Sequence, residues 1–194
     1  MLNDTSSALS LLRTRRSGRP RDLVEPGPSD SDLKEIVGIA SRTPDHGKLA
    51  PWRFVHVAKG DRPAFAALLH RAYLLSNPEP SRPELEAVDR LANQAPTLIV
   101  ALSRPVRNHK IPVWEQELSC GAACMNLLHG AHALGFAAGW VTGWASYSDE
   151  VRQAFAEGDE RMAGFIFIGT PALPQEERPR PLIDTIYSKW SDRA

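Results

Sequence analysis

The chain alternates between stretches whose apolar residues recur every three or four positions and short stretches that are apolar throughout. The first pattern predicts helices that bury one face, and the second predicts strands inside a core. Strands are predicted at Arg53–Ala58, Thr97–Leu102, Phe136–Val141 and Phe165–Ile168. Helices are predicted at Ala8–Arg15, from the Ser29 N-cap to about Ser41, at Arg62–Leu75, Pro83–Gln94, Trp114–Leu134 and about Ser148–Ala156. Proline-rich joints separate several of these segments.

The predicted helix at Trp114–Leu134 differs from the others because it is apolar nearly all round. A helix without a polar face belongs in the middle of a domain or in a contact between subunits. Its two cysteines, Cys120 and Cys124, are the only ones in the chain. Their spacing suits neither a disulfide framework nor a zinc site, so buried thiols that pack as small apolar groups are expected.

Length indicates how much of the chain one core can hold. A chain of 194 residues forms one domain, or one domain with an appended tail. The composition changes after Thr170-Pro171, where a segment rich in proline and charge, Pro174–Pro181, precedes the short apolar segment Leu182–Tyr187. We therefore expect a single domain over residues 1–194, with residues 174–194 as a C-terminal tail.

The charge balance excludes some partners. Lys plus Arg and Asp plus Glu both number 23, so no overall field attracts nucleic acid or an anionic membrane. The chain has no apolar run long enough to span a bilayer, and residues 1–10 lack the charged start and apolar centre of a signal peptide. These features predict a cytoplasmic protein without nucleic-acid or membrane partners.

Two clusters near the start of the chain carry candidate chemistry. The first is Arg15-Arg16-Ser17, and the second is Arg42-Thr43-Pro44-Asp45-His46, followed by Pro51-Trp52. Both lie at predicted element ends, where backbone N–H groups are free to bind an anion. Arginine grips phosphate through two parallel bonds. The clusters favour a phosphorylated ligand, and the alternative is that they form solvated, charged helix ends.

Several familiar catalytic designs are missing from the sequence. There is no G-x-G-x-x-G after a strand, no Walker lysine loop and no G-x-S-x-G elbow. His129 and His132 form one pair near metal-ligand spacing, but no second pair accompanies them, so no metal site is predicted. No side chain is predicted to act as a catalytic nucleophile or base. An enzyme of this kind has to carry its reactivity in a cofactor.

Five segments, in order along the chain, resemble the nitroreductase family of flavin enzymes, and in particular its small single-domain branch. The resemblance covers about residues 8–172. The matching segments are Arg15-Arg16-Ser17; Arg42–His46 with Pro51-Trp52-Arg53-Phe54; Asn108-His109-Lys110 through Trp114-Glu115-Gln116-Glu117; Gly135-Phe136 with Gly139-Trp140-Val141-Thr142-Gly143; and Gly164-Phe165 with Ile168-Gly169-Thr170-Pro171. The third segment together with R-x-P-D-H is the most specific to the branch.

The resemblance implies a fold and an assembly. Family members are α+β proteins with a central mixed β-sheet wrapped by helices. They pair as two-fold homodimers through the long central helix, and FMN lies in the crevice between the subunits. The same resemblance implies that residues 174–194 reach the partner subunit, where Leu182–Tyr187 could extend its sheet.

Site residues also follow from the resemblance. Arg15, Arg16 and Ser17 are expected at the phosphate and ribityl end of FMN, and Arg42 and His46 are expected to reach it from the other side of the crevice, from the partner. Trp140, Val141 and Thr142 are expected along the isoalloxazine ring, with Val141-Thr142 standing where a related sequence has Arg-Ser. Arg178 and Arg180 are candidate additional phosphate partners.

The activity implied is transfer of hydride from NADH or NADPH, through FMN, to a small-molecule oxidant such as a nitroaromatic or a quinone. One alternative is a flavoenzyme of the same fold with another reaction, such as dehalogenation, oxidation of a precursor or breakdown of flavin. The other is a protein that binds flavin or another phosphorylated ligand without turnover.

Overall fold

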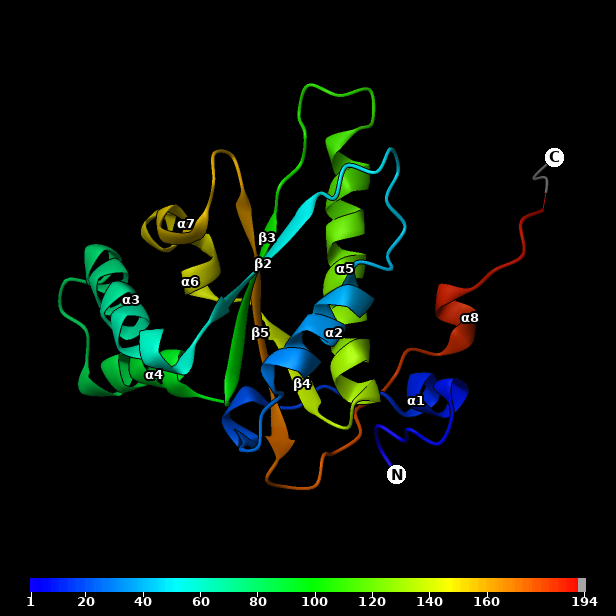
Figure 1. Cartoon of the computed structure of the whole chain (residues 1–194), viewed down its shortest axis with the longest axis horizontal. Coiled ribbons are helices and arrows are strands. Elements are labelled where there is room, and N and C mark those ends of the chain that lie inside the picture. The colour runs from blue at the N-terminus through cyan, green and yellow to red at the C-terminus, as the bar shows by residue number, and fades with distance from the viewer. Residues whose placement is uncertain (192–194) are drawn as a thin grey trace.

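The computed structural model describes residues 1–191 and contains a five-stranded sheet (Figure 1). The strands are β1 (Leu23–Val24), β2 (Trp52–Val57), β3 (Thr97–Ser103), β4 (Ala137–Val141) and β5 (Arg161–Pro171). The long strand β5 is central: it pairs with β3 and β4 along its length and with the short β1 near its end, at Thr170 and Pro171. Strand β2 pairs with β3 at the far side of the sheet.

Helices flank this sheet on both faces (Figure 1). They are α1 (Ala8–Thr14), α2 (Asp30–Ala40), α3 (Arg62–Ser76), α4 (Arg82–Asn93), α5 (Val113–Ala133), α6 (Trp144–Tyr147), α7 (Asp149–Phe155) and α8 (Ile183–Ile186), with short 3₁₀ helices at Pro20–Asp22 and Lys59–Asp61. Helices α2 and α5 cover one face, while α3, α4, α6 and α7 lie on the other. The expected α+β fold is confirmed.

The sheet differs from the expected mixed arrangement, because every pairing among the described residues is antiparallel. The connections explain this. Between β2 and β3 the chain forms the two packed helices α3 and α4, and a helical hairpin returns the chain to the end of the sheet where it left. A single crossover helix would have given parallel neighbours instead.

Strand β3 shows why a continuous apolar run forms in the centre of the sheet. Its side chains alternate between the two faces, so Leu98, Val100 and Leu102 pack with α3 and α4, while Ile99 and Ala101 pack with α2 and α5. All seven residues of β3 are buried. The predicted strand and helix bounds agree with the structure to within a few residues, except that β5 is much longer than its apolar centre and that β1 and α6 were not predicted. The segment Leu182–Tyr187, expected to extend a sheet, contains the short helix α8 instead.

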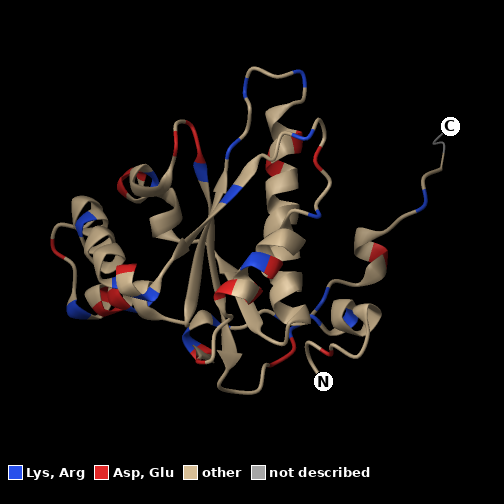
Figure 2. Cartoon of the chain, viewed as in Figure 1, with Lys and Arg blue, Asp and Glu red and all other residues tan. Residues whose placement is uncertain are grey.

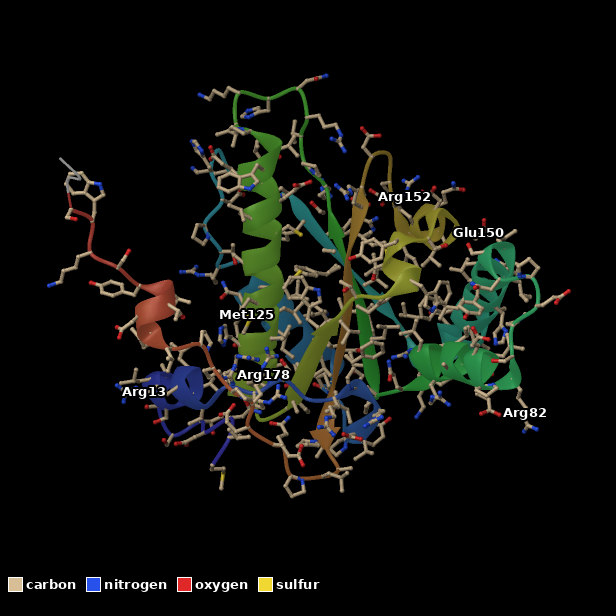
Figure 3. The ribbon with its side chains drawn as sticks, turned by 180° about the vertical axis from the view of Figure 1, so that it is seen from behind. Arg13, Arg82, Met125, Glu150, Arg152 and Arg178 are labelled. Atoms are coloured by element: carbon tan, nitrogen blue, oxygen red, sulfur yellow. The ribbon has the colours of Figure 1, made fainter. Side chains whose placement is uncertain are left out.

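Helix α5 packs one face on the sheet and on α2, and it leaves a second face uncovered. That uncovered face begins with Trp114 and Leu118, which are 68% and 54% exposed, and continues through Ala122 and the partly buried Met125. Figure 3 labels Met125 on this helix. We call Trp114, Leu118, Ala122 and Met125 the α5 stripe.

The C-terminal tail leaves the body of the protein after β5 and carries α8 away from the sheet (Figure 1). Its apolar side chains are more than 60% exposed: Leu182, Ile183, Ile186, Tyr187 and Trp190. Residues 192–194, the last three of the predicted tail, lie outside the described residues. Within the described part of the chain, no helix combines the length and apolar character needed to cross a membrane.

Candidate functional site

Helix α1 presents the first cluster at its C-terminal end. Ser7 caps the start of the helix, and Arg15 follows its last residue in an extended conformation. Beyond it, residues 15–19 form no regular structure, and the Arg15 Nη1 atom donates to the Ser17 hydroxyl at 3.1 Å. We call Arg15-Arg16-Ser17 the arginine loop. Its side chains are partly buried, so they border the protein interior rather than extend freely into water.

The residue that follows the arginine loop, Gly18, lies directly against strand β4. The backbone N–H of Gly18 donates to the carbonyl of Ala138 at 2.9 Å. A side chain at Gly139 would place its Cβ only 2.4 Å from the carbonyl oxygen of Gly18, so this close approach requires glycine. The loop and the strand therefore form one continuous wall.

The C-terminal segment adds two further guanidinium groups beside this loop. The Arg180 Nη2 atom donates to the carbonyl of Arg15 at 3.3 Å. Burial lowers the pKa of Arg15, and repulsion from Arg180, Arg16 and Arg178 lowers it further, while Glu177 opposes the shift. Figure 2 shows Lys and Arg segments meeting beside α1 and the end of α5, and Figure 3 labels Arg178 there.

Four guanidiniums held this closely create a site for an anion. Each of them favours a neighbouring negative charge, and Glu177 is the carboxylate that acts on Arg15. Phosphate matches such a group because guanidinium forks bind its oxygens in pairs. The sequence placed Arg15, Arg16 and Ser17 in one group, and the structure brings Arg178 and Arg180 to them.

Two histidines of α5 lie near the arginine loop. His132 is 1% exposed, and its pKa falls to about 4 because of burial first and then because of Arg15 and His129. Its Nε2 atom accepts the backbone N–H of Ala138 at 3.2 Å. The neutral ring therefore carries its proton on Nδ1. His132 adds no positive charge to the cluster at neutral pH and helps to fix β4.

The second cluster follows α2 and runs along the opposite part of α5. Asn126 donates to the Arg42 carbonyl at 3.3 Å and to the Thr43 hydroxyl at 2.8 Å, and Ser119 donates to the Pro44 carbonyl at 2.5 Å. His46 bonds Glu115 through Nδ1 at 2.8 Å. The Asp45 carboxylate accepts the N–H groups of residues 49 and 50, which fixes the turn. The side chains of Arg42 and His46 are exposed.

The second cluster contacts α5 from Glu115 to Asn126, and within it His46 lies farthest from the arginine loop. His46 pairs with Glu115 in the first turn, whereas Arg15 acts on His129 near the last. Those positions are 14 residues apart, which corresponds to roughly 21 Å along a helix. Among the described residues no hydrogen bond or ion pair joins the clusters. A single chain therefore does not assemble all of the predicted phosphate contacts in one place.

The predicted ring contacts lie at the end of β4. The indole of Trp140 is 37% exposed and donates through Nε1 to the Ala163 carbonyl at 3.0 Å. It passes over Gly164 and approaches Gly121 of α5, two positions where a side chain would crowd or touch it. Val141 is partly buried and Thr142 is exposed. The indole is thus held in place by packing, and Thr142 is free to face a ligand.

Three residues around the arginine loop were not singled out by the sequence: Asn3 and Glu176 contact the loop, and Gln175 contacts Asn3. Asn3 contacts Arg16 across 13 positions and Glu176 contacts it across 160, so no local pattern links them. The expected thiol packing is confirmed, since Cys120 and Cys124 are both buried and free. Within the described residues, no group of three potential metal ligands occurs.

Comparisons with known proteins agree with this fold. The model of the nitroreductase family matches residues 12–170. The protein of Escherichia coli K12 named "Putative NAD(P)H nitroreductase YdjA" is 35% identical over 170 residues, which cover 86% of this chain and 89% of that protein.

Solved structures also resemble this chain. A nitroreductase-like family protein from Bacillus cereus superimposes with a TM-score of 0.79 at 18% identity, covering 94% of this chain and 95% of that one. Iodotyrosine deiodinase, solved with FMN and 3-iodo-L-tyrosine, gives a TM-score of 0.62 at 19% identity, over 86% and 91% of the two chains.

Proposed function

Because the chain belongs to the nitroreductase family, we propose that it is an FMN-dependent oxidoreductase. In this proposal the protein takes hydride from NADH or NADPH and passes it to a small-molecule oxidant such as a nitroaromatic or a quinone. The relative from E. coli is named for the use of NAD(P)H, and the deiodinase structure was solved with FMN. Both names support a flavin and a nicotinamide here.

The observation that carries the proposal is the group of four guanidiniums around the arginine loop. Arg15 is partly buried beside Arg16, Arg178 and Arg180, and its pKa is lowered first by burial and then by these neighbouring positive charges. The terminal phosphate of FMN supplies two negative charges and several acceptor oxygens, which suit this excess. Arg15, Arg16 and Ser17 would hold the phosphate, with Arg178 and Arg180 beside them.

The ring end of the proposed site lies along β4, on the same wall. The Trp140 indole fixes the shape of this surface through its bond to Ala163, and the exposed Thr142 offers a hydroxyl to the ring or to the substrate. The chemistry that a bound flavin supplies is hydride transfer through its N5 atom. The role of this chain is to orient the ring and to exclude water from it, so no side chain has to act as a nucleophile.

We further propose that the site is completed by a second copy of the chain. The α5 stripe leaves large apolar side chains in water, and soluble monomers avoid extended patches of this kind. A two-fold contact through α5 would cover the stripe and build two equivalent sites. In that assembly the partner's loop at residues 42–46 supplies contacts to the site, among them His46, which lies too far from the arginine loop within one chain.

Anaerobic reduction tests the proposal directly. The purified protein, supplied with FMN, is expected to be yellow and to lose its colour when NADH or NADPH is added under nitrogen. A nitroaromatic or a quinone is then expected to restore the colour. A yellow protein that neither nucleotide bleaches would point to another reaction in the same fold, and a protein that takes up no flavin would contradict the proposal as a whole.

A further inference from the structure

The arginine loop is held in shape by contacts outside itself. Residues 15–19 form neither helix nor strand, and the guanidiniums around Arg15 repel one another. A short irregular segment that carries like charges loses considerable conformational entropy when it is fixed in one shape. Its order must therefore come from groups that bond its backbone.

Asn3 provides bonds to both backbone groups of Arg16. Its Oδ1 atom accepts the Arg16 N–H at 2.7 Å, and its Nδ2 atom donates to the Arg16 carbonyl at 3.0 Å. The side-chain amide thus pairs with this residue as a neighbouring strand would. The backbone of Asn3 is left-handed, with φ of 51°, which asparagine tolerates better than most residues. Its own N–H donates to the carbonyl of Thr14 at 3.0 Å.

The C-terminal segment holds the same residue from another direction. Asn3 Nδ2 also donates to the Gln175 Oε1 atom at 2.6 Å, and the Nε atom of Arg16 donates to the Glu176 carbonyl at 2.7 Å. The other amide atom of Gln175, Nε2, is buried without a partner, next to Gly18. Arg16 is therefore fixed at its N–H, its carbonyl and its guanidinium by segments from both ends of the chain.

We propose that Asn3, supported by Gln175, is a positioning residue that holds the arginine loop ready for the phosphate of the flavin. This inference rests on the proposed function, because it assigns the loop to the phosphate end of FMN. Asn3 itself bonds the backbone of Arg16, so it acts through the loop. The consequence is specific: Asn3 matters for a flavin that carries phosphate and has little effect on one that lacks it.

The test uses flavin-free protein titrated with FMN and, separately, with riboflavin, by quenching of flavin fluorescence. The variant Asn3→Gly removes the amide and leaves a residue that accepts positive φ without strain. Gln175→Leu removes the supporting oxygen at similar size. Asn93→Ala is the matched control, since Asn93 makes a comparable amide bond to the Asp89 carbonyl on the surface of α4. Thermal unfolding of each variant is measured in parallel.

We expect Asn3→Gly to weaken FMN binding by about tenfold or more, through the loss of two backbone hydrogen bonds, and to change riboflavin binding less than twofold. Gln175→Leu is expected to do the same to a smaller extent, and the double variant should cost less than the two changes combined, because both act through one contact. Asn93→Ala should leave both affinities unchanged.

Two results would overturn this inference and leave the proposed function standing. One is that Asn3→Gly binds FMN as tightly as the wild type, and the other is that it loses FMN and riboflavin affinity equally. If Asn3→Gly does not fold, the same comparison for Gln175→Leu decides the question. Wild-type protein that binds neither flavin contradicts the proposed function itself.

Discussion

In the guanidinium cluster, burial and the neighbouring positive charges lower the pKa of Arg15. Replacing it with alanine deletes a charge-assisted contact to a dianion, so we expect FMN binding to weaken by about 2 kcal/mol. Arg15→Lys should recover only part of the loss, because an ammonium group does not reproduce the planar fork. Flavin content and the rate of flavin exchange measure the effect. An Arg15→Ala variant that retains full flavin and exchanges it at the wild-type rate would show that the phosphate lies elsewhere.

His132 makes stability depend on pH. Its pKa is about 4 in the folded protein, against about 6.5 in an unfolded chain. The folded state therefore binds fewer protons, and its stability is complete above pH 6.5 and is lost as the pH falls from there through 4. Between pH 7 and 5 the loss amounts to about 2 kcal/mol.

The variant His132→Gln tests this assignment. Its amide oxygen can still accept the Ala138 N–H that the imidazole accepts now, but it does not titrate. Denaturant unfolding at pH 7 and at pH 5 should show a smaller difference in the variant than in the wild type. An equal difference in both proteins would mean that other groups control the acid sensitivity.

For single residues, the sequence predicts the chemistry of a side chain better than it predicts where that side chain lies in the fold. The types and spacing of Arg15, Arg16 and Ser17 were enough to suggest a phosphate, and the structure groups them with Arg178 and Arg180. Asn3 could not be found in this way. The role proposed for it depends on hydrogen bonds to the Arg16 backbone, and a backbone contact leaves no mark on the sequence of either partner.

The ion pair between Arg53 and Glu160 fastens strand β2 to the turn before β5, and the exposed Glu157 of that turn lies 3.6 Å from the same guanidinium. The guanidinium of Arg53 bonds the carboxylate of Glu160, with Nη2 at 2.5 Å from Oε2, and it also donates to the Phe155 carbonyl. The Arg53 side chain is 22% exposed and that of Glu160 is 4% exposed. Burial raises the pKa of Glu160, but the bonds from Arg53 and from the backbone of Glu157 outweigh it, so the pKa is lowered overall.

Removing one partner should therefore cost more than removing both. Arg53→Met leaves a buried carboxylate unpaired, and we expect the free energy of unfolding to fall by about 3 kcal/mol. Adding Glu160→Gln should restore part of it. The surface pair of Arg82 and Glu86 gives the control, since Arg82→Met should change stability by less than about 0.5 kcal/mol. The comparison comes from urea unfolding of the wild type, Arg53→Met, the double variant and Arg82→Met. Equal losses of stability for Arg53→Met and Arg82→Met would show that the Arg53–Glu160 pair does not act as a buried ion pair.

The elements themselves were largely predictable because their patterns reflect burial. The run Thr97–Leu102 is apolar since both faces of β3 are covered, and the apolar segment Trp114–Leu134 is too long to be a strand. Helix α6 was missed because four residues are too few to show a period. The direction of strand pairing was also missed, because it depends on how α3 and α4 return the chain, which no strand sequence records.

For the molecule as a whole, the α5 stripe supports a two-fold assembly that uses both chains in each site. A charge at the last residue of the stripe, Met125→Glu, should separate the subunits and release flavin together. Leu75→Glu is the control, since Leu75 is an exposed leucine on α3, on the other face of the sheet. Sedimentation of the variants beside their flavin absorbance gives the result. A monomeric Met125→Glu protein that holds flavin normally would contradict a shared site while leaving the family unchanged.

The contact between Gly18 and Gly139 has a consequence for how this protein could be altered. Because Gly18 holds the arginine loop to β4, the distance from this loop to Thr142 is set by the number of residues in one strand. Substitutions at Thr142 change the side chain at the far end of this span and leave the length of the span unchanged. One residue inserted between Gly139 and Thr142 would lengthen it and turn each following side chain to the opposite face. In the proposed site, exchange of the side chain at Thr142 would therefore change which oxidants fit, whereas a cofactor of different length would require a strand of different length.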